Sequence, residues 1–185
     1  MFAIRKTKIH GFIELQAPAR ADDRGSFVKT FHREVFAANN LPTEFAEHYY
    51  STSKRGVLRG LHFQLPPHDH AKLVYCVVGE IMDVAVDLRS DSPTYGQNAS
   101  LMISANRANQ ALLVSGLAHG FYVLSETAIV VYNVTTAYAP EYDAGIRWDS
   151  AGVQWPNSRP LLSPRDAALP RLSDFRSPFR MHSAE

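Results

Sequence analysis

Cysteine is almost absent from this chain of 185 residues, in which Cys76 is the single one. One thiol can form no disulfide within the chain, which excludes a disulfide-stapled scaffold and favours a reducing compartment such as the cytoplasm. Cys76 lies in the apolar run LVYCVVG. We therefore expect it to be a buried, small hydrophobic side chain and not a reactive thiol.

An excess of charge of one sign is also missing, since 19 Lys and Arg against 18 Asp and Glu give a formal net charge of +1. Without a basic cluster, the sequence lacks the electrostatic footprint of a nucleic-acid-binding protein. No apolar run approaches the length that spans a bilayer, and the first residues, MFAIRKTKIHGF, lack the apolar segment of a signal peptide. We expect no nucleic-acid partner, no membrane contact and a cytoplasmic location.

What the sequence does contain is a series of short runs of Val, Ile, Leu and aromatic residues. Examples are KLVYCVV, IMDVAVDL, QALLV, GFYVLS and AIVVYNVT, separated by turn signals such as SDSPTYG and VSGLAHG. This spacing is typical of an all-β sandwich or barrel. The length suits one domain with a sizeable core, so we expect a single domain over residues 1–185.

Local patterns refine this picture. Alternation within IMDVAVDL places Asp83, Ala85 and Asp87 on one face of a strand, which gives that strand a polar face. Helix is expected at residues 33–40, around an inward-facing Val-Phe pair, and at residues 163–169, where a serine can cap and a proline takes the first helical position. We expect residues 171–185, with scattered charge and proline, to lie on the surface or fray.

Three histidines and a lysine stand together in GVLRGLHFQLPPHDHAKLVYCVVGE. The spacing of His68 and His70, with His119 downstream in GLAHG, superficially resembles the metal sites of cupins, which are double-stranded β-helix proteins. Those sites add a glutamate shortly after the paired histidines, because a divalent ion favours a carboxylate beside neutral imidazoles. Here Lys72 follows, and its ammonium would repel the ion. We therefore expect no metal ligand set, and loop histidines without a special role are one interpretation of His68 and His70.

Six blocks resemble, in order and in spacing, the dTDP-4-dehydrorhamnose 3,5-epimerase family: DDRGSF, GVLRGLHFQ, AKLVYCVVGEIMDVAVDLRSDSPTYGQ, GLAHGFYVLSE, YAPEYDAGIRWD and LLSPRDAALP. The resemblance implies a double-stranded β-helix, a cupin-like jelly roll with short flanking helices, with the catalytic blocks in residues 22–170. It also implies an isomerase without cofactor or metal. Such an enzyme inverts carbons 3 and 5, or one of them, of a nucleoside-diphosphate 4-keto-6-deoxyhexose through an enolate.

This chemistry needs a base tuned near neutral pH, a cation at the developing oxyanion and an acid across the ring. By the resemblance, His62 is the general base and Asp166 the carboxylate that orients it, as in other histidine-based sites. Lys72 then lies near the enolate oxygen, Tyr132 is the acid on the opposite face, and Asp83 orients Lys72. Non-catalytic interpretations of the same residues stay open. His62 could be a strand histidine with its hydrogen bonds satisfied, and Asp83 could be a solvated carboxylate. Tyr132 could be an aromatic side chain of the core, and Asp166 an ordinary residue in the first turn of a helix.

The resemblance also implies substrate-binding residues. Arg59 and His119 would lie near the diphosphate or the sugar, since the planar guanidinium can bond two phosphate oxygens at once. Tyr138, in the block YAPEYDAGIRWD, completes this part of the pocket. The segment DDRGSFVKT, with Arg24, Phe27 and Lys29, is expected to reach toward the pocket of a second subunit in a homodimer.

Two departures from the family pattern concern the nucleotide. Lys29 stands where the family commonly has glutamate, and Glu47 stands where it commonly has glutamine. Lysine can only donate hydrogen bonds and ionised glutamate can only accept them, which suits cytosine better than thymine and makes a CDP-linked sugar a hypothesis. Tyr75 and Asn133 replace residues that are often basic in the family, which leaves their effect on the pocket open.

Two other classes of function remain beside the epimerase. One is a metal-dependent cupin that uses His62, His68, His70 and His119, and the other is a silent sugar-nucleotide-binding module. The motifs also leave open the pathway, the nucleotide, and whether one carbon or two are inverted.

Overall fold

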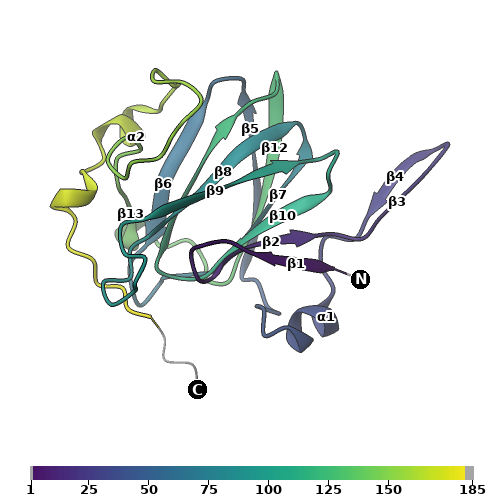
Figure 1. The fold of residues 1–185 in the computed structure, drawn as a ribbon, viewed down its shortest axis with the longest axis horizontal. Helices are drawn as coiled ribbons and strands as arrows, with labels where there is room; N and C mark the ends of the chain where they lie inside the picture. The colour runs from purple at the N-terminus through teal and green to yellow at the C-terminus, as the bar shows by residue number, and fades with distance from the viewer. Residues whose placement is uncertain (1, 182–185) are drawn as a thin grey trace.

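The computed structural model describes residues 2–181, in which two antiparallel sheets pack face to face (Figure 1). The larger sheet has six strands, in the order β1 (Ala3–Lys6), β2 (Phe12–Gln16), β10 (Asn109–Leu113), β7 (Lys72–Val78), β12 (Thr127–Val134) and β5 (Glu47–Lys54). The second sheet has five strands, in the order β13 (Asp143–Gly145), β6 (Leu58–Gln64), β11 (Leu117–Val123), β8 (Glu80–Asp87) and β9 (Asn98–Ser104).

The chain alternates between these sheets as it advances. Strand β7 lies in the larger sheet, β8 and β9 in the smaller, β10 in the larger, β11 in the smaller and β12 in the larger. Each pairing within the two sheets is antiparallel. This winding is that of a double-stranded β-helix, or jelly roll, so the fold class expected from the sequence is confirmed.

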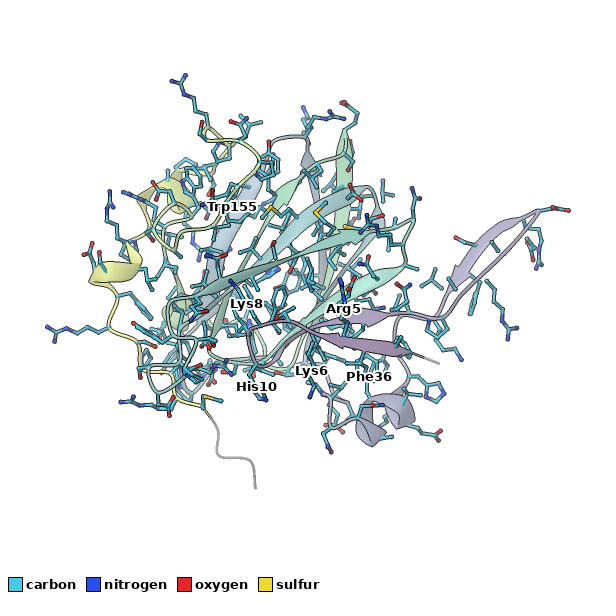
Figure 2. The ribbon with its side chains drawn as sticks, in the orientation of Figure 1. Arg5, Lys6, Lys8, His10, Phe36 and Trp155 are labelled. Atoms are coloured by element: carbon cyan, nitrogen blue, oxygen red, sulfur yellow. The ribbon has the colours of Figure 1, made fainter. Side chains whose placement is uncertain are left out.

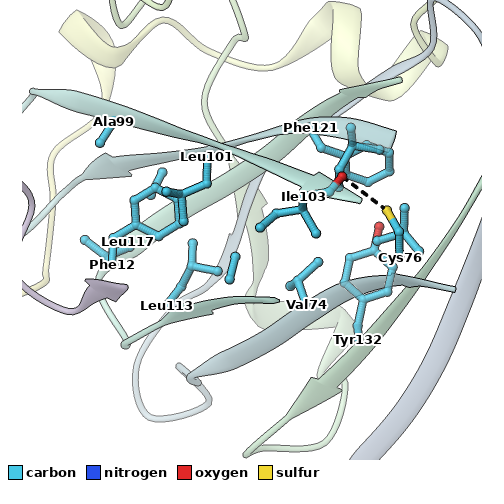
Figure 3. Close-up of a cluster of buried hydrophobic side chains, with 14 of the residues drawn as sticks. Phe12, Val74, Cys76, Ala99, Leu101, Ile103, Leu113, Leu117, Phe121 and Tyr132 are labelled. Carbon is cyan, nitrogen blue, oxygen red and sulfur yellow. Dashed lines mark hydrogen bonds between the residues drawn. The ribbon is translucent and has the colours of Figure 1, made fainter. Parts of the chain in front are cut away.

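The main core fills the space between the two sheets (Figure 3). Alternation along β7 turns Val74 and Cys76 inward, where they meet Ile103 of β9 and Phe121 of β11. Cys76 is 6% exposed, as the sequence predicted, and its thiol lies 3.8 Å from the Ile103 carbonyl oxygen. Each fully buried large apolar side chain in this layer contributes on the order of 1.5–3 kcal/mol relative to exposure.

A second core covers the outer face of the five-stranded sheet. There Leu61, Val84 and Val86 pack under the C-terminal segments, which include α2 (Pro164–Ala168) and the 3-10 turn η2 (Leu172–Asp174). The C-terminal tail was expected to lie on the surface or fray; over residues 171–181 it lies against this sheet and buries Phe179, which is 3% exposed. Residues 182–185 of that prediction are outside the described part.

Because both faces of β8 are covered, one sequence-based expectation needs correction. Asp83 and Asp87 do share a face, but both are fully buried, so the strand has no solvated polar side. Asp87 is compensated by the buried guanidinium of Arg89 at 2.7 Å and by the hydroxyls of Ser92 and Thr94. Burying an ionised carboxylate is tolerated when such partners are present.

Both expected helices are present. Helix α1 (Arg33–Ala38) covers the outer face of the larger sheet and buries Phe36 in a cluster with Phe2 and with residues of β2, β7 and β10 (Figure 2). Helix α2 begins after Ser163, whose Oγ accepts a hydrogen bond from the backbone N–H of Asp166 at 3.0 Å. Between residues 2 and 181 no helix has the length and apolar character needed to cross a membrane.

A two-stranded hairpin, β3 (Ala19–Asp22) and β4 (Gly25–Val28), projects away from both sheets (Figure 1). We call this hairpin together with Lys29, whose N–H bonds the carbonyl of Pro18, the arm (residues 19–29). Phe27 at its middle is 66% exposed, so the arm carries an apolar side chain that the body of this subunit leaves in solvent.

Candidate active site

A cavity of about 520 Å³ opens between the two sheets at the end where β5, β6, β7, β11 and β12 approach one another. Its walls combine inward-facing residues of these strands with residues 136–143 and the start of α2. The lining residues are Glu47, Tyr49, Ser51, Arg59, His62, Phe63, Gln64, His70, Lys72, His119, Phe121, Tyr132, Val134, Thr136, Tyr138, Asp143 and Arg165. A pocket with convergent polar groups inside an apolar sandwich is where a small ligand is expected to bind.

His62 and Asp166 form the first hydrogen-bonded pair of this site. Strand β6 presents His62, and its Nε2 lies 2.7 Å from Oδ1 of Asp166, while Oδ2 of that carboxylate accepts the N–H of Gly60 at 3.2 Å. Burial alone would raise the pKa of Asp166, but the bonds from His62 and Gly60 outweigh it and hold this pKa below its ordinary value. An ionised Asp166 fixes the N–H of the imidazole on Nε2, which leaves Nδ1 able to accept a proton.

A second pair, His119 with Asp83, lies beside the first. His119 of β11 is the direct cross-strand neighbour of His62, and its Nε2 lies 2.8 Å from Oδ2 of Asp83 on β8. Both side chains of this pair are buried, and the other oxygen of Asp83, Oδ1, is buried without a hydrogen-bond partner among the described residues. An unsatisfied buried carboxylate oxygen is costly, and it adds negative potential to this end of the cavity.

Lys72, at the first position of β7, brings a cation to the same place. Its Nζ donates a hydrogen bond to the backbone carbonyl of His62 at 3.3 Å. Burial lowers the pKa of Lys72 to about 8, with the negative charges of Asp143 and Asp83 opposing that shift. Asp83, which we expected to orient Lys72, is hydrogen-bonded to His119, and its negative charge raises the pKa of Lys72.

Tyr132 faces the cavity from the opposite sheet, on β12. Its hydroxyl lies 3.3 Å from Oγ of Ser51, and its ring stacks on Tyr49, the neighbour on β5, with centroids 4.8 Å apart. Burial raises the pKa of Tyr132, so the phenol keeps its proton near neutral pH. Figure 3 shows this ring at the edge of the core near Phe121 and Cys76.

The outer part of the cavity is more exposed and carries more charge. Arg59 is held by Ser53, whose Oγ accepts its Nε–H at 2.9 Å. Glu47 Oε1 accepts the backbone N–H of Tyr138 at 3.1 Å, and the Tyr138 ring is 58% exposed. The structure therefore places Arg59, Glu47 and Tyr138 in the wall of the same cavity as His62.

The arm residues named from the sequence lie elsewhere. Arg24 pairs with Asp22 at the tip of the arm, and Phe27 and Lys29 line a separate hollow with Arg20 and His32. Lys29 and Glu47 therefore do not line the same pocket within one subunit.

Tyr75 and Asn133, whose effect on the pocket the sequence left open, do not line the main cavity. The alternation of β7 and β12 turns these two side chains to the face opposite Lys72 and Tyr132. Tyr75 lines a shallow hollow near the base of the arm, and Asn133 hydrogen-bonds His48 on β5.

Sequence reasoning missed part of the wall. His70, which is not among the site residues predicted for the epimerase, lines the cavity, as do Tyr49 and Gln64. His70 gave a signal as a histidine two residues before the predicted Lys72, and Gln64 gave one as the last residue of the family block GVLRGLHFQ. His68 packs against Tyr142 instead, with ring centroids 4.4 Å apart. In the part of the chain that the structure describes, no three His, Cys, Asp or Glu side chains are grouped so that they could hold a metal ion.

The arrangement has the components of proton transfer next to a carbonyl group. A histidine oriented by a carboxylate lies on one sheet, a protonated phenol lies on the facing sheet, and a buried ammonium lies beside the histidine. These three groups could together serve as a base, an acid on the opposite side of a ligand, and a cation for a developing oxyanion.

Comparison with known proteins agrees with this geometry. The family model of dTDP-4-dehydrorhamnose 3,5-epimerase matches residues 6–174. The dTDP-4-dehydrorhamnose 3,5-epimerase of Shigella flexneri is 42% identical over 87% of this chain and 91% of its own length.

Solved structures give the same answer. The dTDP-6-deoxy-D-glucose-3,5-epimerase of Legionella pneumophila, in complex with dTDP-4-keto-L-rhamnose, superposes with a TM-score of 0.93 at 33% identity, over 99% of this chain and all of the other (100%). A 3'-monoepimerase of Streptomyces bikiniensis, in complex with dTDP-quinovose, superposes with a TM-score of 0.86 at 32% identity, over 91% of this chain and 87% of the other. The chain is a member of the dTDP-4-dehydrorhamnose 3,5-epimerase family, whose members are isomerases of sugar nucleotides.

Proposed function

We propose that this protein epimerises a dTDP-linked 4-keto-6-deoxyhexose, of the dTDP-4-dehydro-6-deoxyglucose type, at carbons 3 and 5. The observation that carries the proposal is the placement of His62 and Tyr132 on facing sheets across one cavity. Inverting a carbon requires that a proton leave one face of the sugar ring and another arrive on the opposite face. Two proton-handling groups on opposite walls meet this requirement.

Each group has one task in this reaction. Nδ1 of His62 takes the hydrogen next to the keto group, and Asp166 stabilises the imidazolium that forms. The electron pair of the broken C–H bond moves onto the keto oxygen, where the Lys72 ammonium stabilises the enolate. Tyr132 then donates its proton to the other face of the carbon, and His62 and Tyr132 return to their starting states by proton exchange with water. No metal or cofactor is required by this scheme.

The nucleotide is proposed from the relatives. The similar structures hold dTDP-sugars, and the outer cavity of this chain offers Arg59 for the diphosphate. A CDP-sugar is the alternative, favoured by the acceptor Glu47 in the cavity wall and by Lys29 on the arm. Calorimetric titration with dTDP and with CDP separates them, since comparable affinity would remove the argument from Lys29 and Glu47.

We also propose a homodimer in which the arm reaches the cavity of the partner, and a cytoplasmic location. The exposed Phe27 and the distance of Arg24 and Lys29 from their own cavity support the dimer. A monomer in light scattering at micromolar concentration would contradict it. The cytoplasmic location is supported by the single cysteine, because a chain with one thiol gains no internal disulfide from an oxidising compartment.

The test of the reaction is proton NMR in deuterated buffer with dTDP-4-keto-6-deoxyglucose. We expect the signals of the carbon 3 and carbon 5 hydrogens to disappear as deuterium replaces them. Loss of one signal alone would identify a monoepimerase, which the likeness to the Streptomyces bikiniensis enzyme makes a real alternative. His62→Ala is the control, and exchange by that variant at the normal rate would rule out His62 as the base.

Two further results would contradict the proposal as a whole. Absence of exchange with both the dTDP-linked and the CDP-linked sugar would leave a binding module as the interpretation. Loss of exchange after treatment with EDTA, restored by one equivalent of a divalent metal, would instead support a metal-dependent enzyme.

A further inference from the structure

The hydroxyl of Tyr132 gives up a proton in the proposed reaction, although it lies where a negative charge is costly. Three rings pack around that of Tyr132, with centroids 4.8 Å away for Tyr49, 6.2 Å for His119 and 6.4 Å for Phe121. Burial raises the pKa of Tyr132, which disfavours its ionised form. The phenolate that remains after proton donation therefore needs a hydrogen-bond donor close by.

Ser51 of β5 is the hydrogen-bond partner of this hydroxyl. Its Oγ lies 3.3 Å from the phenol oxygen, and within residues 2–181 neither oxygen has another hydrogen-bond partner. Strand alternation turns Ser51 into the cavity, whose wall it lines, while Tyr50 and Thr52 are exposed on the other face. The serine hydroxyl is thus engaged with Tyr132 in the wall of the binding cavity.

The neighbouring inward positions of β5 support the same part of the site. Tyr49, directly opposite Tyr132 in the strand register, stacks on its ring, and Ser53 accepts the Nε–H of Arg59. Strand β5 thus holds the ring of Tyr132 through Tyr49 and its hydroxyl through Ser51. Of the influences that oppose burial and lower the pKa of Tyr132, the bond with Ser51 is the largest, followed by the charge of Arg59.

The direction of this hydrogen bond depends on the task of Tyr132. Each hydroxyl can donate or accept, so in the free protein the pair is satisfied either way. Once the Tyr132 proton points at a carbon of the ligand, the phenol oxygen can only accept from Ser51. Hydrogen bonds to an ionised oxygen are about twice as strong as neutral ones. A donor at Ser51 therefore stabilises the state after proton transfer more than the state before it, as catalysis requires.

We propose that Ser51 is a positioning residue, whose Oγ–H donates to the phenol oxygen of Tyr132 and so turns the Tyr132 proton toward the hexose. The proposal rests on the function proposed above, because it requires Tyr132 to be the acid. In this step the electron pair of the enolate forms the new C–H bond with the Tyr132 proton, and the keto group is restored. The negative charge passes to the phenol oxygen, where the Ser51 hydroxyl stabilises it until water returns a proton.

The experiment separates inversion from deuterium exchange in deuterated buffer, with dTDP-4-keto-6-deoxyglucose as the substrate. His62 alone can remove a hydrogen and return deuterium to the same face, which labels the sugar without inverting it. Inversion requires Tyr132 as well. Proton NMR at early times therefore gives a ratio of inverted sugar to labelled, uninverted sugar, and this ratio reports on Tyr132 and not on folding or binding.

Two variants of Ser51 have nearly the same shape and differ in the hydroxyl group. Ser51→Val removes the donor, and we expect the ratio to fall about tenfold to hundredfold, as for one hydrogen bond to a charged group, while exchange through His62 continues. Ser51→Thr keeps the donor and should stay within about threefold of the unmodified protein. Thr52→Val is the matched control, since its side chain is exposed on the opposite face, and it should leave the ratio unchanged.

An unchanged ratio in Ser51→Val would overturn the proposal, as would an equal loss of inversion and exchange. A fall in Ser51→Thr as large as that in Ser51→Val would also overturn it, because the hydroxyl would then not carry the effect. Failure of the epimerase proposal shows up separately. The unmodified protein would then neither exchange nor invert the sugar, or Tyr132→Phe would invert it at the normal rate.

Discussion

The cavity contains two histidine–aspartate pairs that are alike in geometry and different in surroundings. His62 and His119 are cross-strand neighbours, and their Nε2 atoms lie 2.7 Å and 2.8 Å from an aspartate oxygen. The His62 side chain is 27% exposed and that of His119 is 4% exposed. Asp166 uses both of its oxygens in hydrogen bonds, whereas one oxygen of Asp83 has no partner among the described residues.

This difference separates a pair that can exchange protons from a pair that shapes the electrostatic field. A base must contact its substrate and must afterwards exchange its proton with water. The partly exposed His62 can do both more easily than the buried His119. The buried Asp83 contributes charge near Lys72, where low dielectric makes a charge act over a longer range. The sequence motifs contain both histidines and both aspartates, but they do not indicate which pair is buried.

The largest expected effect comes from replacing His62 and His119, one at a time, with asparagine. His62→Asn should slow deuterium exchange by roughly 10²–10⁴-fold, the usual contribution of a general base. His119→Asn should slow it by about tenfold, because it changes the wall of the cavity and not the base. The measurement is the NMR exchange rate at saturating substrate, and a larger loss for His119→Asn would reverse the assignment of the two pairs.

The next effect concerns the carboxylate behind His62. Asp166→Asn should reduce the exchange rate by roughly 10²-fold or more, because an amide neither stabilises an imidazolium nor fixes the tautomer. Substrate affinity should change little, since Asp166 lies behind the imidazole. A rise in KM with kcat unchanged would show that Asp166 positions substrate instead.

The third prediction uses pH to test the role of Asp83. Since the pKa of Lys72 is about 8, the ammonium is lost as pH rises through that value, and the exchange rate should fall with it. Asp83→Asn removes a negative charge that raises the pKa of Lys72, so this fall should move to lower pH. The Lys72→Met variant should exchange deuterium slowly at all pH values, and its rate should not fall as the pH rises through 8. An unchanged pH profile in Asp83→Asn would show that Asp83 does not act on Lys72.

The same shift affects folding in a defined direction. The pKa of Lys72 is lower in the folded chain than its ordinary value of 10.5, so the unfolded chain holds more protons between about pH 8 and pH 10.5. The contribution of Lys72 to the free energy of unfolding therefore rises with pH across that window. Lys72→Met should remove this rise in urea unfolding measured at pH 7.5 and pH 10.

The smallest effect is expected at the cap of α2. Ser163→Ala removes the acceptor for the N–H of Asp166 and should cost about 1 kcal/mol in the free energy of unfolding. Because this short helix positions Asp166, the exchange rate should fall a few-fold as well. Ser173→Ala is the matched control, since that hydroxyl bonds only the exposed neighbour Asp174. Equal behaviour of the two variants would show that the cap does not position the carboxylate.

Several parts of this structure could be predicted from local sequence, each for a physical reason. Strand periodicity predicted the sheets, and the Ser163-Pro164 cap predicted α2, because both patterns act over a few residues. The apolar run around Cys76 predicted its burial. The family blocks indicated the residues of the cavity, and the structure places His62, Asp166, Lys72, Tyr132 and Asp83 at one end of it, although their roles remain predictions.

Other parts could not be predicted because they depend on contacts between distant segments. The burial of Asp83 requires that the larger sheet pack over the inner face of β8, where Asp83 lies with Ile81 and Ala85. The separation of Lys29 from Glu47 requires an arm that leaves the body.

The sequence by itself determined the fold class and the family, because strand alternation and ordered motif blocks are properties of neighbours along the chain. It also determined which residue types could carry the chemistry. Only the tertiary structure decided which of His62 and His119 keeps contact with the open cavity and which one is buried. Exposure, desolvation and hydrogen-bond direction arise when β5, β6, β7, β11 and β12 meet around one space, and motif spacing does not encode them.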